Sequence, residues 1–195
     1  MFHWEDFGRV KQSTAPDATL DSVEQRDAWF AASDAYGDVK SNRGSSQMEH
    51  FHTIEQKGFA VRLYRKQDGS IVAAFRGTSN KEEMLKDVDI RSTSREFLPC
   101  GRIHNGFANA YDSVRAELLA HTKHEKVQFV GHSLGGAMAT IAGGDPAFKD
   151  KKKSVYTYGA PQVGDEHYTK CYPKDTEYTR IIHQSDPVPI MNMFY

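Results

Sequence analysis

The sequence predicts an α/β fold with a mostly parallel central sheet flanked by helices. In its second half, β-rich and helical segments alternate, an order typical of parallel sheets: "KVQFVGH", "SLGGAMATIAGG", "SVYTYGAP" and "TEYTRIIHQ". A G-x-S-x-G pattern, "GHSLG" (131–135), stands where the first of these strands meets its helix. The 195 residues, 38% of them apolar, suffice for a sizeable core, and we expect a single domain over 1–195.

The N-terminal part is expected to contain one helix. Residues 1–20 are polar and end in "STAPDATL", which indicates an N-terminal arm. A helix is predicted over 21–37, ending at a glycine, because its apolar residues recur near helical spacing: Val23, Trp29, Phe30 and Ala35 or Tyr36. The next segment, 37–50, is predicted to be a loop.

The middle of the chain combines a hairpin with two helical segments. Two β-rich runs in 58–77 are joined by "QDGS", whose Asp-Gly pair favours a tight turn. A short, charged helix is predicted over 80–90, with Met84, Leu85 and Val88 on one side, and 92–104 is predicted to be irregular. A longer helix is predicted over 105–124, where the residues at helical spacing are Phe107, Ala110, Tyr111, Val114, Leu118 and His121.

The "GHSLG" junction predicts an exposed nucleophile. In such a strand-to-helix turn, Ser133 presents its hydroxyl above the sheet edge, and the helix behind it aims backbone N–H groups at a developing oxyanion. Gly131 and Gly135 carry no side chain, which allows the strand and the helix to approach each other closely. The alternative is an ordinary serine N-cap with glycines for packing. The small residues that follow, Gly136 and Ala137, favour the nucleophile.

Two further strand ends add polar groups. Thr78 follows the strand end "AAFRG" and offers a backbone N–H and a hydroxyl as oxyanion donors; the alternative role is a helix cap. Asp186 follows the last predicted strand, in a turn fixed by Pro187 and Pro189. A carboxylate there is suited to orient an imidazole, although Asp before Pro is also common in turns.

These stretches together resemble the class 3 lipases, fungal-type triacylglycerol lipases with an α/β-hydrolase core. The matching pieces are "AWFAASDAYG", "VAAFRGTS", "RIHNGFANAY", "VQFVGHSLGGAMATIA", "YTYGAPQVGD" and "YTRIIHQSDPVPIM". The resemblance implies a serine ester hydrolase that cleaves acyl esters of lipids through an acyl-enzyme. It implies Ser133 as nucleophile, Asp186 as triad acid, and Thr78 with the backbone N–H of Leu134 as the oxyanion hole.

By the same resemblance, 80–90 takes the place of the lid helix. Its only apolar candidates are Met84, Leu85 and Val88, which favours a modest or partly soluble ester over bulk oil. A phospholipase that acts at a membrane surface is a further alternative.

The expected third triad member is missing from its usual place. α/β-Hydrolases run in the order Ser, Asp, His, yet no histidine follows Asp186, so the chain is apparently shortened at its C-terminus relative to the family. Among the nine histidines, His183 is the nearest substitute base, while His132 is directed away from Ser133 and His104 matches a family position outside the triad. Three explanations stay open: a fragment, a displaced histidine, or a catalytically impaired lipase-like binding or regulatory protein.

The remaining sequence features indicate no further function. No metal or cofactor is implied, and the net charge of −1 gives no indication of nucleic-acid binding. A transient contact with a membrane or lipid surface and the oligomeric state stay open. Without a signal-like N-terminus, a cytoplasmic protein is expected, or one exported without a recognisable signal; a mature secreted form would look the same. Cys100 and Cys171 are expected to be free thiols, because a disulfide needs an oxidising compartment.

Overall fold

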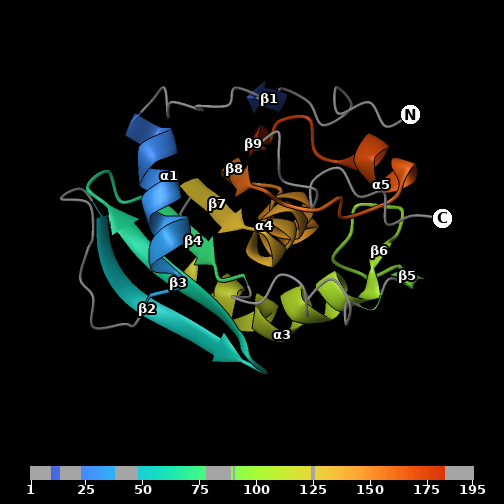
Figure 1. Cartoon of the computed structure of the whole chain (residues 1–195), viewed down its shortest axis with the longest axis horizontal. Coiled ribbons are helices and arrows are strands. Elements are labelled where there is room, and N and C mark those ends of the chain that lie inside the picture. The colour runs from blue at the N-terminus through green and yellow to red at the C-terminus, as the bar shows by residue number, and fades with distance from the viewer. Residues whose placement is uncertain are drawn as a thin grey trace.

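The computed structural model describes residues 10–13, 23–37, 48–77, 89, 91–123 and 126–182. Its centre is a seven-stranded sheet in the order β1-β9-β8-β7-β4-β3-β2 (Figure 1). The strands of this sheet are β1 (Val10–Ser13), β2 (Met48–Gln56), β3 (Phe59–Lys66), β4 (Ile71–Phe75), β7 (Lys126–His132), β8 (Lys152–Tyr158) and β9 (Glu177–Ile181). A separate two-stranded ladder joins β5 (Ser92–Thr93) to β6 (Ile103–His104).

The prediction of a mostly parallel α/β sheet is confirmed. Neighbouring strands from β1 through β9, β8 and β7 to β4 are parallel, whereas β3 pairs antiparallel with both β4 and β2. The predicted turn of the β3–β4 hairpin forms with Gly69 at φ 81°, and Asp68 accepts a hydrogen bond from the backbone N–H of Ser70 at 3.0 Å. Only the hairpin connections are short enough to give antiparallel neighbours.

Helices cover both faces of the sheet (Figure 1). They are α1 (Val23–Asp34), α3 (Asn105–His121), α4 (Leu134–Gly144) and α5 (Glu166–Cys171), with a short 3-10 turn at Pro146–Phe148. Alternate residues of one strand serve the two faces: Ala73 and Phe75 belong to the core beneath α3 and α4, and Val72 to the core beneath α1. None of the helices in the described ranges is long and apolar enough to cross a membrane.

The buried face of α1 differs from the predicted one. Trp29 and Phe30 are 41% and 51% exposed, while the buried positions at helical spacing are Ala28, Ala31, Ala32 and Ala35. Small alanines allow the helix to lie close to the sheet, so the two aromatic rings are left outside. At the end of α1, Asp34 accepts a hydrogen bond from Arg62 at 2.9 Å, which fastens the helix to β3.

Several elements fall where the sequence indicated none. β1 lies within the expected N-terminal arm, β2 begins inside the predicted loop 37–50, and α5 interrupts the long loop before β9. β1 and β2 are the two edges of the sheet, and their polar sequences lack the apolar alternation of half-buried strands. Lys153 lies in β8 and is buried, although it belongs to a run of three lysines.

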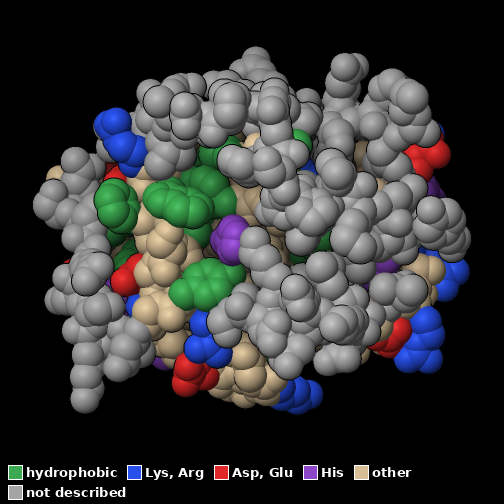
Figure 2. Space-filling model, in the orientation of Figure 1, with side chains coloured by type: hydrophobic (Ala, Val, Ile, Leu, Met, Phe, Trp, Pro, Cys, Tyr) green, Lys and Arg blue, Asp and Glu red, His purple; other side chains and the backbone are tan. Residues whose placement is uncertain are grey.

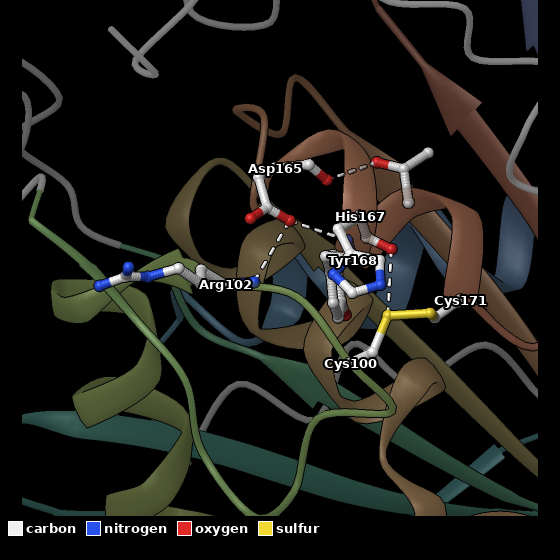
Figure 3. Close-up of a disulfide and its surroundings, with 7 residues drawn as sticks. Cys100, Arg102, Asp165, His167, Tyr168 and Cys171 are labelled. Atoms are coloured by element: carbon white, nitrogen blue, oxygen red, sulfur yellow. Dashed lines mark hydrogen bonds between the residues drawn. A yellow bond between two sulfur atoms is a disulfide. The ribbon is translucent and has the colours of Figure 1, made fainter.

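The expectation of two free thiols is wrong. Cys100 and Cys171 form a disulfide that joins the loop before β6 to the end of α5 (Figure 3). Asp165 holds the same two segments together, because its carboxylate accepts hydrogen bonds from the backbone N–H groups of Tyr168 at 2.8 Å and Arg102 at 3.2 Å. The sequence separation of 71 residues concealed this pairing, because no local pattern shows that the loop and the helix lie side by side in the fold.

Candidate active site

Ser133 occupies a strained turn between β7 and α4. Its backbone has φ 55° and ψ −124°, a conformation that non-glycine residues rarely adopt. The strand ends at His132 and the helix begins at Leu134, so the whole change of direction falls on the serine. The backbone N–H of Ser133 donates to the carbonyl oxygen of Tyr158 on β8 at 2.9 Å, which fixes the turn to the neighbouring strand.

Two glycines make this turn sterically feasible. A Cβ on Gly131 would collide with the carbonyl group of Gly135, and a Cβ on Gly135 would collide with the carbonyl oxygen of Phe75 on β4. Gly136 is also constrained, since its Cβ would stand 2.6 Å from that of Ala160. The predicted reason for the glycines, close approach of strand and helix, is therefore the observed one.

The hydroxyl of Ser133 is buried and has no hydrogen-bond partner among the described residues. An orphaned buried hydroxyl is costly in a folded protein, so its retention calls for a chemical role. Every residue of α4 is buried, and the helix starts directly behind Ser133. The first N–H groups of a helix have no acceptor within the helix, and its N-terminal end favours negative charge.

The neighbouring strands β4 and β9 end at the same edge of the sheet as β7. β4 runs parallel to β7, with Phe75 paired to Gly131, and its extension Gly77 lies directly against Gly135. β9 runs parallel to β8 and its last residue, Ile181, pairs with Tyr158. Parallel strands open their ligand sites at their carboxyl ends. Thr78 follows Gly77, and His183 and Asp186 follow β9; these three lie outside the described residues.

Two histidines near the turn make contacts that belong to the packing of the fold. The ring of His132 is half-buried, and its Nδ1 lies 3.0 Å from the hydroxyl of Tyr36, so it points to α1. His104 is fully buried, stands just before α3, and packs its ring edge-on against Phe107 at 5.4 Å. Sequence reasoning did not identify Tyr36 as a partner, because nothing in the local pattern connects it to β7.

The surroundings of the turn are aromatic and buried. Burial raises the pKa of Tyr36 to about 12, so the phenol stays protonated at ordinary pH. Burial also raises the pKa of Tyr158, whose ring meets that of Trp29 edge-on at 4.9 Å. Such a low-dielectric surrounding strengthens any hydrogen bond made to charge that develops at Ser133.

The predicted lid residues Met84, Leu85 and Val88 lie outside the described residues. The chain after them is well anchored at Asp89. Its carboxylate accepts a hydrogen bond from the Asn105 side chain at 2.7 Å, and its carbonyl accepts one from the backbone N–H of Gly106 at 3.1 Å. The guanidinium of Arg91 and the Asn105 amide hold the pKa of the Asp89 carboxyl well below its ordinary value.

Comparison with known proteins identifies a consistent set of relatives. A family model described as Lipase (class 3) matches residues 72–195. A lipase from Rhizopus niveus is 29% identical over 150 residues, which is 69% of this chain and 37% of the relative. The secreted mono- and diacylglycerol lipase 1 of Fusarium solani is 32% identical over 128 residues, or 61% of this chain and 38% of the relative.

Solved structures give the same picture of the fold. A triacylglycerol lipase from Penicillium expansum superposes with a TM-score of 0.70 at 21% identity, covering 92% of this chain and 75% of the other. The matched part of this chain spans well under half the length of the two curated relatives.

Proposed function

Because the chain belongs to the class 3 lipase family, we propose that it is a serine ester hydrolase that cleaves acyl ester bonds of lipids. The proposal rests most directly on Ser133, which stands at a strained turn in front of α4 and whose buried hydroxyl has no hydrogen-bond partner among the described residues. A hydroxyl that only capped the helix would accept a hydrogen bond from it, and Ser133 makes no such cap bond.

In the proposed reaction, Ser133 Oγ attacks the ester carbonyl carbon while a base removes its proton. The carbonyl oxygen becomes an oxyanion that accepts hydrogen bonds from the Leu134 N–H and from Thr78. Collapse of this intermediate breaks the bond to the alcohol, which leaves with the proton from the base. Water then attacks the acyl-enzyme by the same steps and releases the acid.

Asp186 is proposed as the carboxylate that orients and stabilises the base, and His183 as the base itself. Both follow β9, which is separated from β7 in the sheet by β8 alone. In Ser-His-Asp enzymes, replacement of the aspartate that orients the imidazole lowers kcat on the order of 10⁴-fold. His183 is the only part of this assignment that departs from the family order, so it needs its own test.

Fluorophosphonate labelling followed by peptide mass spectrometry tests the nucleophile. We expect label on Ser133 in the folded protein and none in Ser133→Ala. An intact, folded protein that is never labelled would instead favour a catalytically impaired lipase-like binding or regulatory protein. His183→Ala and Asp186→Asn, assayed separately on a short-chain ester, test the triad; full activity in His183→Ala would remove His183 from the mechanism and leave Ser133 in it.

A lipid surface is the proposed place of action. Trp29 and Phe30 project from α1, and hydrophobic side chains gather over this helix on the face shown in Figure 2. Trp29 contacts Tyr158, whose carbonyl oxygen binds Ser133, so the exposed aromatic pair flanks the turn. Aromatic side chains with a polar tip are favoured at membrane–water interfaces.

Vesicle binding tests this contact. We expect Trp29→Ala/Phe30→Ala to bind phosphatidylcholine vesicles less well, and Leu119→Ala on α3 to bind as the parent does. Unchanged partitioning of the double variant would contradict the proposal. A parallel panel of short-chain ester, mono- and diacylglycerol, triacylglycerol and phospholipid separates the lipase from the phospholipase alternative.

Action outside the reducing cytosol is proposed as well. The disulfide between Cys100 and Cys171 persists only under oxidising conditions, and the Fusarium relative is a secreted enzyme. Determination of the thiol content of protein taken directly from its native compartment tests this; two free thiols would contradict it.

A further inference from the structure

A second cluster of chemically capable side chains lies on a part of the fold that the hydrolase reaction does not use. His52 comes from β2, and Glu117 and His121 come from α3. One ligand atom from each of the three lies within 4.8 Å of the others. We propose that this trio binds one late first-row divalent cation, with Zn²⁺ as the reference ion, and thereby links the edge strand to the helix.

Helical geometry brings two of the three ligands together. Glu117 and His121 are four residues apart, so their side chains lie on the same face of α3. His52 reaches them from the facing strand, and its Nε2 stands 2.8 Å from Glu117 Oε1. The two imidazole rings are stacked, with centroids 4.0 Å apart and an interplanar angle of 12°.

Secondary hydrogen bonds prepare the ligands for a metal. Nδ1 of His121 lies 2.9 Å from the backbone carbonyl oxygen of Glu117. A carbonyl oxygen only accepts, so this nitrogen holds the proton and leaves the Nε2 lone pair for a cation. Such a bond from the second ring nitrogen orients metal-binding histidines and raises their basicity. The amide of Gln56 donates to Glu117 Oε2 at 3.3 Å, and Oε1 accepts from Nε2 of His52 at 2.8 Å. A cation bound between Oε1 and this nitrogen takes the place of the shared proton, which is released to solvent.

The types of ligand atom and their exposure indicate which cation the site favours. Two imidazoles and one carboxylate form a three-ligand set suited to zinc and its neighbours, whereas calcium and magnesium prefer oxygen ligands alone. The side chains of His52 and Glu117 are 32% and 33% exposed, so a water molecule has access to the fourth position. Bonds of about 2.0–2.1 Å place tetrahedral ligand atoms roughly 3.4 Å apart. Binding therefore requires the two stacked rings to turn so that both nitrogen lone pairs point at one ion.

A second group of three residues, whose side chains are of metal-binding types, does not compete for the cation in the folded protein. Cys100, His167 and Cys171 also lie within ligand distance of one another, but their two sulfurs are joined to each other (Figure 3). A disulfide offers no thiolate, which is the form of cysteine that binds metals. His167 is exposed on α5 and so supplies a matched histidine for control experiments.

Calorimetric titration with ZnCl₂ in phosphate-free buffer tests the proposal on chelator-treated protein with its disulfide intact. We expect one Zn²⁺ per chain and a higher Tm in its presence. Binding should be at least about tenfold weaker in His121→Ala, His52→Ala and the near-isosteric Glu117→Gln, as for other disturbed metal sites. His167→Ala should bind as the parent does.

The same titration also has outcomes that would contradict the proposal. Equal affinity in Glu117→Gln and the parent, or loss of binding in His167→Ala alone, would assign the ion elsewhere and overturn the proposal. No heat and no change in Tm at millimolar Zn²⁺ would overturn it too. Shifts of the His52 and His121 imidazole resonances on adding Zn²⁺ give a readout that does not depend on whether a variant folds well.

Discussion

The hydroxyl of Tyr36 lies 3.0 Å from Nδ1 of His132, the residue immediately before Ser133. The same hydroxyl donates to the carbonyl oxygen of His132 at 3.3 Å. The chain that follows α1 is thus bonded to both the ring and the backbone of the strand end that positions the nucleophile. A mispositioned nucleophile costs rate even when the reacting groups are intact.

Removal of this hydroxyl is expected to lower both stability and activity. Tyr36→Phe keeps the ring and loses the bonds, which should reduce the free energy of unfolding by about 1 kcal/mol. Urea denaturation measures the loss, and hydrolysis of a short-chain ester measures the effect on rate. A double-mutant cycle with His132→Gln isolates the coupling between the two residues. Additive effects in that cycle would show that the bond does not matter.

The turn at Ser133 should tolerate no side chain at Gly135. Gly135→Ala places a methyl group against the carbonyl oxygen of Phe75. We expect the free energy of unfolding to fall by at least the amount typical of overpacking, about 1–3 kcal/mol, or the variant not to fold. Gly58→Ala is the matched control, because Gly58 has φ 84° but a methyl group added there would meet nothing within 4 Å. That variant should lose only about 1 kcal/mol, from backbone strain alone. Equal stability of the two variants would contradict the steric account.

Local patterns predicted the elements that form the nucleophilic turn and failed at the sheet edges. The central residues of β7 and every residue of α4 are buried, which gives both mainly apolar sequences, and the glycines at their junction mark the close approach. β1 and β2 are edges whose pairing depends on partners distant in sequence. On α1, the large rings of Trp29 and Phe30 suggested the buried face, yet alanine spacing decided it, since close packing on the sheet excludes bulky groups.

Contacts between residues far apart in the sequence were likewise invisible to local reasoning. The bond between Tyr36 and His132 spans 96 positions, and the disulfide between Cys100 and Cys171 spans 71. The ion pair of His52 with Glu117 spans 65. No periodicity reports such pairs, and only the strand order brings them together. The turn that carries Ser133 was predictable because strand, turn and helix are contiguous in the sequence.

Reduction of the disulfide should destabilise the fold markedly. The sequence separation of 71 residues corresponds, in the chain-entropy account, to a loss of about 4 kcal/mol when the cross-link is removed. Thermal denaturation with and without dithiothreitol should therefore show a large fall in Tm. Cys100→Ala/Cys171→Ala should start at the lower Tm and show no response to the reductant. A parent protein that keeps its Tm after complete reduction would contradict the prediction.

Replacement of Lys153 should stabilise the protein. Lys153 lies in β8 with only 3% of its surface exposed, and burial lowers the pKa of its ammonium group. Lys153→Met retains the length of the side chain and removes the buried charge, which should raise the free energy of unfolding by roughly 1 kcal/mol at neutral pH. Lys152→Met, at the exposed neighbouring position, should change it little.

The pH dependence of this gain has a definite sign. Below the lowered pKa of folded Lys153, both the folded and the unfolded chain hold the proton, so the folded chain bears the full cost of the buried charge. Between that pKa and the ordinary value of about 10.4, the unfolded chain binds more protons, and the parent gains stability as pH rises. The advantage of Lys153→Met should therefore shrink from neutral pH toward pH about 10.5. Urea denaturation of both chains across this range measures it, and an advantage that grows with pH would contradict the prediction.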